Sequence, residues 1–600
     1  MKKVNRTLLK SFLALIALLL IVSIILFIPQ KVSSKPWAQT NGPYGGYIHC
    51  FAIEDKDIFV GTEGSGVFHS TDNGKSWSEI NSGLTSKNVY SLAISGKKIF
   101  AGTNGGVYTS DNNGVSWNLI DSDLKNTIVL SLAASGTNIF AGTSSGVFLS
   151  TDNGANWKAV NSGLTFLSVN SLAIKDNNIF AGTEDGGIFL STNNGESWSP
   201  VNSGLTTTQI NSLLVSGTTI FAGTYGGGVF VSTNNGASWD AVNTGLTNKN
   251  IYSLVCSGSN IFAGTDDGIY FSTDNGANWI AVSSGLTNKY VFSLAANGNN
   301  IFAGTNGGGI FLSTDNGASW KGVNSGLTNT HVGSITKSGS FIYAGTNGAG
   351  VFLSDDNGEN WKEINSGLTN PYVFSLAVMG NNIFAGTNGG GVFLSTDNGT
   401  TWKESNSGLS NKYVYSLAVS GSNIFAGTLG GGVFLSTDNG TSWNPVNSGL
   451  PNPNIGSLAV IDKNIFAGTF GNGVFLSNDN GASWKEINLG LTSTQIFSLA
   501  ASGTKLYAGT PEDGVFLSTD NGTSWNMINS GLTNTKIDTL SASGETVFAG
   551  TYGGGVFTST DSGKNWKEKN SGLENIDVYS FCISDSNIFA GTNGKGIWVR

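Results

Sequence analysis

The chain has 600 residues, of which 85 are glycine, 9 are proline and 12% are charged. Because one hydrophobic core rarely holds so many residues, this length predicts several domains or an array of repeats. The low charge excludes long amphipathic helices, and the abundant glycine is typical of many short strands joined by tight turns. Acids outnumber basic residues by 39 to 30, which excludes nucleic acid as a partner.

The chain begins with a basic segment followed by an apolar one. Lys2, Lys3, Arg6 and Lys10 precede an apolar run at residues 12–28. This run is longer than the usual core of a signal peptide, about 7–15 residues, and just reaches the length that spans a bilayer. We expect residues 1–34 to form a helix that is either a cleaved signal peptide or a retained membrane anchor. In both cases the rest of the protein lies outside the cytoplasm, whether secreted, periplasmic or at the cell surface, and only residues 12–28 contact the membrane.

The chain has three cysteines, Cys50, Cys256 and Cys582, which lie far apart within apolar strand-like runs. Their odd number and their surroundings predict small buried residues rather than a disulfide or a metal site. We expect no metal and no cofactor.

A tryptophan recurs at a nearly constant spacing along the rest of the chain. It ends an octapeptide that reads STDNGASW at residues 313–320, and successive copies are 40 or 41 residues apart. A period near forty that contains four strand-like runs is typical of a β-propeller blade. The thirteen tryptophans are Trp77, Trp117, Trp157, Trp198, Trp239, Trp279, Trp320, Trp361, Trp402, Trp443, Trp484, Trp525 and Trp566.

One unit contains the four expected strands. Residues 413–419 (YVYSLAV) predict the inner strand, 423–428 (NIFAGT) the second, 432–436 (GVFLS) the third and 443–447 (WNPVN) the outer one. Ser-Gly, Gly-Gly and Asn-Gly pairs separate these runs and supply the positive φ that tight turns require. The chain is therefore predicted to be all-β and built of four-stranded blades.

The octapeptide predicts a structural turn rather than an active site, because it occurs once in every unit. Its Asp and Asn can bond the amides of the turn between the third and outer strands, and its Gly can take a left-handed conformation. The tryptophan is expected to pack between blades, where a buried indole contributes roughly 4–6 kcal/mol before entropy is subtracted. Calcium or ligand binding is the alternative, but most copies carry one acid, unlike a calcium loop.

The pattern S/T-x-D-x-G-x-x-W resembles the Asp-box (BNR-type) repeats, and the resemblance covers nearly the whole chain after residue 36. In that family the boxes lie on turns away from the ligand-binding face of a β-propeller. The resemblance implies no single function, since such repeats occur in sialidases, tandem-propeller xyloglucan hydrolases, sortilin-type receptors and a photosystem II assembly factor. The sialidase role is excluded, because those enzymes bind a carboxylate with three arginines and this chain has only Arg6 and Arg600.

Fourteen copies of the second-strand motif, from residues 58–62 to 588–592, accompany the thirteen octapeptides. Residues 37–41 match an outer strand, and residues 596–600 read as a third strand that lacks its octapeptide. The N-terminal strand is therefore expected to complete the last blade and leave no open sheet edge. Since propellers typically have about four to eight blades, two rings of seven are predicted, with one larger ring as the alternative. We expect the first ring in residues 35–312 and the second in 313–600, with a boundary anywhere within 312–331.

Propellers usually bind ligands on the face that carries the loop before each inner strand and the turn between the second and third strands. These positions vary while the framework does not, and they hold polar and aromatic residues suited to sugars or peptides. Aromatic filler at the bases of loops is the alternative interpretation. The predicted binding residues are Tyr225, Tyr290, His331, Tyr372, Tyr413, Phe470 and Tyr552.

These features predict a non-catalytic extracytoplasmic binding or scaffold protein whose partner is a protein or a polysaccharide. The alternative is a glycoside hydrolase that resembles the xyloglucan enzymes and acts through two carboxylates such as Glu184 and Asp266, which lie in loops of the same face. No serine nucleophile motif or metal-ligand cluster indicates other hydrolytic chemistry. A purely structural envelope component is the third hypothesis, and the sequence leaves the oligomeric state open.

Overall fold

The computed structural model describes residues 36–40, 44–120, 123–326, 328–573, 577–584 and 587–600. Over these ranges the regular elements are strands, which form fourteen four-stranded sheets and one two-stranded ladder. No helix in the described ranges is long and apolar enough to cross a membrane. The helix expected at residues 1–34 lies outside the described residues, so the choice between signal peptide and anchor stays a prediction.

The first seven sheets, blades 1–7, follow one another along the chain with four consecutive strands each. The strands are β3 (Ile48–Glu54), β4 (Asp57–Thr62), β5 (Val67–Ser70), β6 (Ser78–Glu79), β7 (Val89–Ser95), β8 (Lys98–Thr103), β9 (Gly106–Ser110), β10 (Asn118–Leu119), β11 (Val129–Ser135), β12 (Asn138–Thr143), β13 (Gly146–Ser150), β14 (Lys158–Ala159), β15 (Val169–Lys175), β16 (Asn178–Thr183), β17 (Ile188–Ser191), β18 (Ser199–Pro200), β19 (Ile210–Ser216), β20 (Thr219–Thr224), β21 (Gly228–Ser232), β22 (Asp240–Ala241), β23 (Ile251–Ser257), β24 (Asn260–Thr265), β25 (Gly268–Ser272), β26 (Ile280–Ala281), β27 (Val291–Asn297), β28 (Asn300–Thr305), β29 (Ile310–Ser313) and β30 (Lys321–Gly322).

The other seven sheets, blades 8–14, repeat this order, except that blade 14 takes its outer strand from the N-terminus. The strands are β32 (Val332–Ser338), β33 (Phe341–Thr346), β34 (Gly350–Ser354), β35 (Lys362–Glu363), β36 (Val373–Met379), β37 (Asn382–Thr387), β38 (Gly391–Ser395), β39 (Lys403–Glu404), β40 (Val414–Ser420), β41 (Asn423–Thr428), β42 (Gly432–Ser436), β43 (Asn444–Pro445), β44 (Ile455–Ile461), β45 (Asn464–Thr469), β46 (Gly473–Ser477), β47 (Lys485–Glu486), β48 (Ser498–Ser502), β49 (Lys505–Gly509), β50 (Val515–Ser518), β51 (Asn526–Met527), β52 (Ile537–Ser543), β53 (Thr546–Thr551), β54 (Gly555–Ser559), β55 (Lys567–Glu568), β56 (Val578–Ile583), β57 (Ile588–Thr592), β58 (Ile597–Val599) and β1 (Ala38–Gln39).

Consecutive strands of a blade pair antiparallel, as the four runs of each unit predict. The outer strands are shorter than expected: residues 443–447 predicted five residues, whereas β43 has two. The reason is that the backbone of Trp443 leaves the ladder, and its amide donates to Ser407 O of the preceding blade at 2.8 Å. The start of each outer strand therefore joins two blades instead of extending one.

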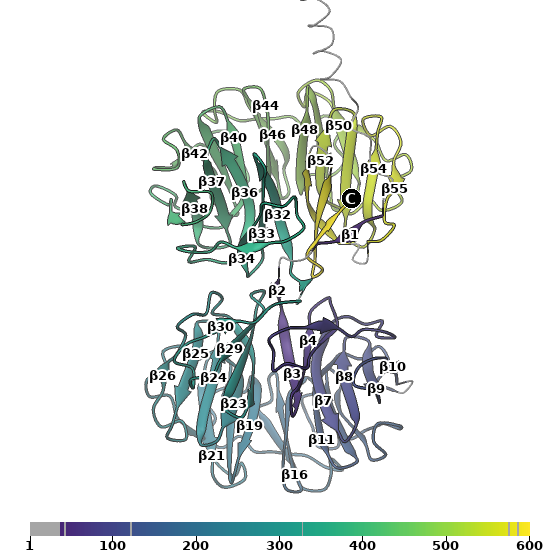
Figure 1. Cartoon of the computed structure of the whole chain (residues 1–600), viewed down its shortest axis with the longest axis vertical. Helices are drawn as coiled ribbons and strands as arrows, with labels where there is room; N and C mark the ends of the chain where they lie inside the picture. The colour runs from purple at the N-terminus through teal and green to yellow at the C-terminus, as the bar shows by residue number, and fades with distance from the viewer. Residues whose placement is uncertain (1–35, 41–43, 121–122, 327, 574–576, 585–586) are drawn as a thin grey trace, which may run out of the picture.

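Two contacts between inner strands close the sheets into two rings. In the first ring β27 lies beside β3, where the Ser293 hydroxyl donates to Ile48 O at 3.1 Å. In the second ring β56 lies beside β32, where the Ser580 hydroxyl donates to Val332 O at 3.1 Å. The prediction of two seven-bladed propellers rather than one larger ring is confirmed. Figure 1 shows the rings one above the other, the first in purple to teal and the second in green to yellow.

The N-terminal strand closes the second ring. Ala38 pairs with Val599 and Gln39 with Trp598, so β1 is the outer strand of blade 14, as the match of residues 37–41 to an outer strand predicts. The first domain, predicted as residues 35–312, therefore needs correction at its start, because β1 pairs with β58 and belongs to the second ring. β30 (Lys321–Gly322) belongs to the first ring and lies within the range of 312–331 that was predicted to contain the boundary.

The chain crosses between the rings through two short strands, β2 (Gly45–Gly46) and β31 (Thr328–Asn329), which pair with each other. Figure 1 shows β2 at the junction of the two rings. The φ angles of Gly45 and Gly46 are 138° and 128°, a region that favours glycine. A Cβ at Gly45 would lie 3.3 Å from Gly307 O, so glycine also permits the close approach of the two rings.

The octapeptide is a turn held by its own side chains. In residues 313–320, the Ser313 hydroxyl donates to Asp315 Oδ1 at 2.7 Å and accepts the Gly317 amide at 2.8 Å. Asp315 Oδ1 also accepts the Ser319 amide at 2.9 Å. Asn316 and Gly317 both have positive φ, 57° and 86°. The turn is therefore structural, as predicted, but Ser and Asp hold the amides while Asn supplies left-handed backbone.

All thirteen tryptophans that end the octapeptides are buried. Trp402, 3% exposed, packs with Tyr343 and Val351 of the preceding blade. Its Nε1 donates to Ile364 O, again of that blade, at 2.7 Å. The expected packing of the indole between blades is confirmed.

The three cysteines are free. Cys582 lies in the core between blades 14 and 8, and Cys50 packs against the core between blades 1 and 2. Cys50 and Cys256 are less buried than expected, since each lies on an inner strand whose residues are half-buried.

Candidate functional site

The predicted binding faces of the two rings meet along a seam. Asn347 Nδ2 of blade 8 donates to the Tyr47 hydroxyl of blade 1 at 2.7 Å. Asn288 Nδ2 of blade 7 donates to Gly348 O of blade 8 at 2.8 Å. Each contact joins the loop before an inner strand of the first ring to the turn after a Gly-Thr pair of the second. The two candidate faces therefore border one shared space.

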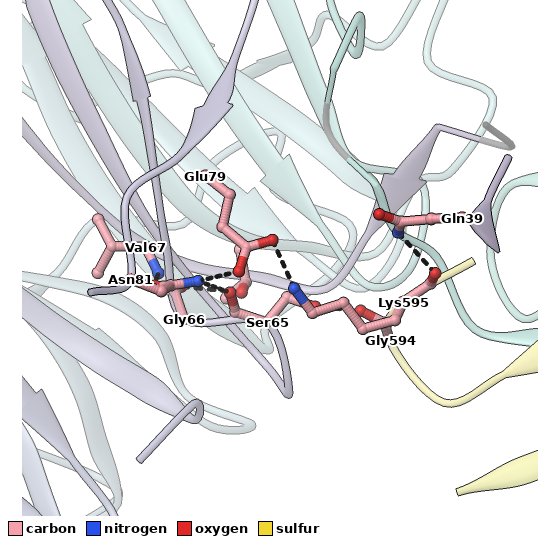
Figure 2. Close-up of polar contacts among 9 residues, drawn as sticks. Gln39, Ser65, Gly66, Val67, Glu79, Asn81, Gly594 and Lys595 are labelled. Atoms are coloured by element: carbon pink, nitrogen blue, oxygen red, sulfur yellow. Dashed lines mark hydrogen bonds and ion pairs between the residues drawn. The ribbon is translucent and has the colours of Figure 1, made fainter. Parts of the chain in front are cut away.

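An ion pair between a buried lysine and a partly exposed glutamate links blade 14 to blade 1 beside the seam (Figure 2). Lys595, between β57 and β58, is 4% exposed, and its Nζ lies 2.5 Å from Glu79 Oε2 of β6. The other carboxylate oxygen of Glu79 accepts Asn81 Nδ2 at 2.6 Å, and Gln39 Nε2 of β1 donates to Lys595 O at 2.8 Å. The Lys595–Glu79 pair therefore joins the two rings, and the other two hydrogen bonds hold each partner within its own ring.

An open cleft of about 560 Å³ lies between the rings at blades 6, 7 and 9. We call it the inter-ring cleft. Loops of both rings form its walls, and three of the residues singled out in the sequence line it. Its polar and aromatic lining includes Asp266, Asn288, Lys289, Tyr290, Asn370 and Tyr372.

Tyr290 belongs to an aromatic cluster at the mouth of the first ring. Its hydroxyl donates to the Tyr252 hydroxyl at 2.8 Å, and its ring centroid lies 4.8 Å from that of Phe292. Burial and the nearby Asp266 carboxylate raise the pKa of Tyr290. The hydroxyl therefore stays protonated and neutral at physiological pH.

Tyr372 approaches the cleft from the second ring. Its hydroxyl lies 3.4 Å from Asn288 Nδ2 of the first ring, so the two walls touch at this point. Burial raises the pKa of Tyr372 to about 12, which keeps this hydroxyl neutral as well.

Asp266 is held in place by two amides. Its Oδ2 accepts Asn250 Nδ2 at 2.9 Å, and its Oδ1 accepts the amide of Asn248. Glu184, the other acid considered for hydrolysis, is exposed in blade 4, two blades from Asp266, and does not line the cleft. The structure therefore does not bring these two carboxylates together in the cleft.

Glu63 and His331 lie at the centre of the seam. Glu63 Oε2 is 3.7 Å from His49 Nε2, and this close imidazole lowers the pKa of Glu63 despite its partial burial. Burial lowers the pKa of His331 to about 4, so this imidazole is neutral near pH 7. Asn347 occupies in blade 8 the position that Glu63 occupies in blade 1. The equivalent positions of the two blades therefore carry a carboxylate in the first ring and an amide in the second.

The remaining predicted binding residues lie outside the cleft lining. Tyr225, Tyr413 and Tyr552 are each roughly half exposed, and Lys536 Nζ lies 5.8 Å from the centre of the Tyr552 ring. Phe470 packs against Tyr415 and Phe497, which is the filler role that the alternative interpretation gave to such residues.

A family model described as the DUF6242 beta propeller domain matches residues 44–165 and 328–467. The two matches begin at equivalent places, at the crossing strands that precede blades 1 and 8. No curated protein matches the chain.

Several solved structures resemble most of the chain. An ancestral GH74 enzyme has a TM-score of 0.67 and 18% identity, over 95% of this chain and 99% of that one. The GH74 xyloglucanase of Xanthomonas campestris has a TM-score of 0.63 and 16% identity, over 94% and 99%. PorZ, a surface component of the type-IX secretion system of Porphyromonas gingivalis, has a TM-score of 0.56 and 14% identity, over 94% and 87%. The chain is a tandem β-propeller.

The sequence interpretation missed one position in each blade of this tandem propeller, near the start of the inner strand. In every blade but the twelfth it is the second residue of that strand, where the register with the next strand shifts, as between Val89 and Ser91, so the residue forms a β-bulge. In blade 12 the equivalent residue, Phe497, directly precedes β48. Bulge side chains of neighbouring blades contact one another, since the His49 ring lies 5.2 Å from Tyr90 and 5.9 Å from Phe292. They therefore line the axis of the ring. In the sequence these positions could have been found because their residue type changes from blade to blade while the residues on either side stay nearly the same. We call them the axial positions: 49, 90, 130, 170, 211, 252 and 292 in the first ring, and 333, 374, 415, 456, 497, 538 and 579 in the second.

Proposed function

We propose that this tandem propeller is a non-catalytic extracytoplasmic protein that binds a glycan in the inter-ring cleft. The observation that carries the proposal is that Tyr290 and Tyr372 line the cleft from opposite rings. Aromatic rings stack on the apolar faces of sugars while their hydroxyls hydrogen-bond. Exposed Thr287 adds a hydroxyl that matches the donors and acceptors of sugar hydroxyls. The amides of Asn288 and Asn370 hold the walls of the cleft through hydrogen bonds to Gly348 O and Asn388 O.

A glycan suits this cleft better than a protein partner does. The cleft volume of about 560 Å³ is within the range of small-ligand sites, roughly 300–1,000 Å³. A stable protein interface needs a broader surface, about 800 Å² on each partner. One solved structure of this fold is named a xyloglucanase, which supports a glycan as the ligand class.

An extracytoplasmic location agrees with the basic and apolar segment at residues 1–34. PorZ, which shares the fold, is named as a bacterial surface component. We place residues 36–600 outside the cytoplasm, with residues 12–28 as the only membrane contact if the segment is retained.

Hydrolysis by two carboxylates is the second candidate, because Asp266 lines the cleft and the fold is shared with GH74 enzymes. Glycoside hydrolysis requires a pair of carboxyl groups about 5–9.5 Å apart across the scissile bond. Asp266 already accepts two amides, and Asp267, the other acid in the described lining, is adjacent to it and lies 3.7 Å from Lys289 Nζ. The second ring contributes no acid to the described lining of the cleft. Binding without cleavage is therefore the function that this geometry supports best.

The test is a titration of the full chain, purified in a mild detergent, with xyloglucan oligosaccharides and other neutral oligosaccharides. The double variant Tyr290→Ala/Tyr372→Ala is expected to bind about tenfold more weakly, since each stacked ring contributes roughly 0.5–1.5 kcal/mol. Tyr413→Ala is the matched control, because Tyr413 lies on the same face outside the cleft lining. Equal affinity of the double variant and the wild type would refute the cleft as the site. Release of reducing ends that Asp266→Asn abolishes would establish the hydrolase instead.

A further inference from the structure

The mouth of the second ring is a circle of aromatic side chains interrupted by one carboxyl. The ring centroids of Phe374 and Tyr415 lie 4.8 Å apart, and those of Phe470 and Phe497 lie 5.5 Å apart. On the other side His331 stacks on Tyr579 at 4.8 Å. Asp538 occupies the axial position between Phe497 and Tyr579. We call this set the axial circle: Phe374, Tyr415, Phe470, Phe497, Asp538 and Tyr579, with His331 stacked on the last.

Two glycines at axial positions shape the axial circle. A Cβ at Gly456 would lie 2.6 Å from Phe470 Cε1, so the Phe470 ring occupies the place that a side chain at 456 would take. At Gly333 an added Cβ would meet nothing closer than Val373 O at 3.4 Å. An aromatic ring therefore fills the place of a side chain at Gly456, whereas a side chain at Gly333 would meet only backbone atoms of Val373 and Phe374.

One carboxyl oxygen of Asp538 has no hydrogen-bond partner among the described residues. This oxygen, Oδ2, is buried. Burial, together with the charge of Asp577, raises the pKa of Asp538 to about 7. A buried carboxylate without a donor is costly, so a cation placed beside it would stabilise its charged form.

The other titratable groups around Asp538 do not supply that cation. His331 is neutral near pH 7, because burial lowers its pKa to about 4. Burial also raises the pKa of Tyr579, which is therefore neutral. Asp577 adds a negative charge. Lys536, on the same face, lies over the Tyr552 ring instead and does not perturb Asp538.

We infer that the axial circle binds an organic ammonium group. The faces of aromatic rings attract a cation, and a carboxylate in the same wall neutralises it, which is how proteins hold quaternary ammonium and methylated lysine groups. Phe497 is 37% exposed, so the circle reaches solvent at this ring. This site is separate from the inter-ring cleft, so it does not depend on the function proposed above.

The probe is tetramethylammonium chloride, titrated into the full chain in detergent and followed by saturation-transfer NMR, with tert-butanol as the uncharged analogue. We expect saturable binding of tetramethylammonium and none of tert-butanol. The ligand does not titrate, so its affinity should rise about tenfold from pH 6 to pH 8 as Asp538 ionises. Absence of saturable binding, or equal binding of the two probes, would overturn the site.

Three variants make the test specific. Asp538→Asn should weaken binding at pH 8 at least tenfold and remove its pH dependence. Phe497→Leu, which removes a partly exposed ring and no charge, should weaken it about two- to fivefold. Glu512→Gln, an exposed acid on the same face, is the matched control and should bind as the wild type does. Unchanged binding by correctly folded Asp538→Asn would contradict the proposal even if the wild type binds. Glucosamine and N-acetyl-lysine amide then distinguish an amino sugar from a lysine side chain as the source of the ammonium group.

Discussion

Lys595 of the second ring and Glu79 of the first form an ion pair although 516 residues separate them in the chain. The lysine side chain is 5% exposed and the glutamate side chain 30%. Removing one partner of a buried pair leaves the other charge uncompensated, which usually costs more than the pair itself stabilises. Solvent offsets part of this cost at Glu79, which reaches water.

Lys595→Met is expected to lower the free energy of unfolding by about 1–3 kcal/mol, measured by denaturant titration. Lys289→Met is the control, because the pair of Lys289 with Asp267 spans 3.7 Å between two exposed side chains. Its expected effect is at most about 0.5 kcal/mol. If Lys289→Met lowers the free energy of unfolding as much as Lys595→Met does, the ion pair between the rings stabilises the protein no more than an exposed pair does.

Trp402→Ala is expected to cost roughly 3–5 kcal/mol, because truncation of a buried aromatic leaves a cavity between blades 8 and 9. It also leaves Ile364 O without the indole donor that lies 2.7 Å away. Trp402→Phe should recover part of the packing but not this hydrogen bond, so its thermal midpoint should fall between those of the wild type and the alanine variant. If the alanine variant melts at the same temperature as the wild type, the indole does not contribute to the stability of the fold.

The blade could be predicted from the sequence because its determinants are local. Asp315 bonds residues within its own octapeptide, and Trp402 packs against a blade that precedes it by one repeat. The ring closure was predictable too, since residues 37–41 carry the pattern of an outer strand with no other blade to join.

The candidate site was only partly predictable, because it depends on which blades face each other across the seam. Tyr290 and Tyr413 hold equivalent positions in their blades, yet only Tyr290 lines the cleft. Nothing near Lys595 in the sequence distinguishes it from a surface lysine. Asp538 was not predicted as a site residue for another reason. The regular alternation of side chains along a strand would place it on a face of the sheet, whereas the β-bulge between Ile537 and Thr539 directs it toward the axis of the ring.

The octapeptide turns predict a specific loss of stability in acid. Hydrogen bonds from Ser319 hold the pKa of Asp315 at about 2, and the same arrangement holds those of Asp438 and Asp479 at about 2. The pKa of an unfolded aspartate is about 3.9, so the folded state binds fewer protons between pH 4 and pH 2. This contribution is fully present above pH 4 and should be lost as the pH falls from about 4 to 2. Denaturant titrations across that range measure it.

Replacing Asp315, Asp438 and Asp479 together by Asn is the matched variant for this acid effect. The fold already contains an uncharged copy of the turn, in which Asn234 Oδ1 accepts the Ser238 amide at 3.0 Å. We therefore expect the triple variant to fold and to lose less stability between pH 4 and pH 2 than the wild type. If the free energy of unfolding falls equally in the two proteins between pH 4 and pH 2, these carboxylates are not the source of the acid effect.

Trp37→Ala is expected to destabilise the second ring although Trp37 precedes every residue of the first. Trp37 is 3% exposed, packs with Phe548 and Trp598, and donates from Nε1 to Lys569 O at 2.6 Å. Its loss should cost roughly 3–5 kcal/mol and loosen the outer edge of blade 14. Hydrogen exchange should accelerate in β55 and β58 while β7–β10 of the first ring keep their protection. Trp117→Ala removes the equivalent indole between blades 1 and 2. In that variant hydrogen exchange should accelerate in β7–β10 while β55 and β58 keep their protection. Faster exchange in the first ring of the Trp37 variant would contradict the closure of blade 14 by the N-terminal strand.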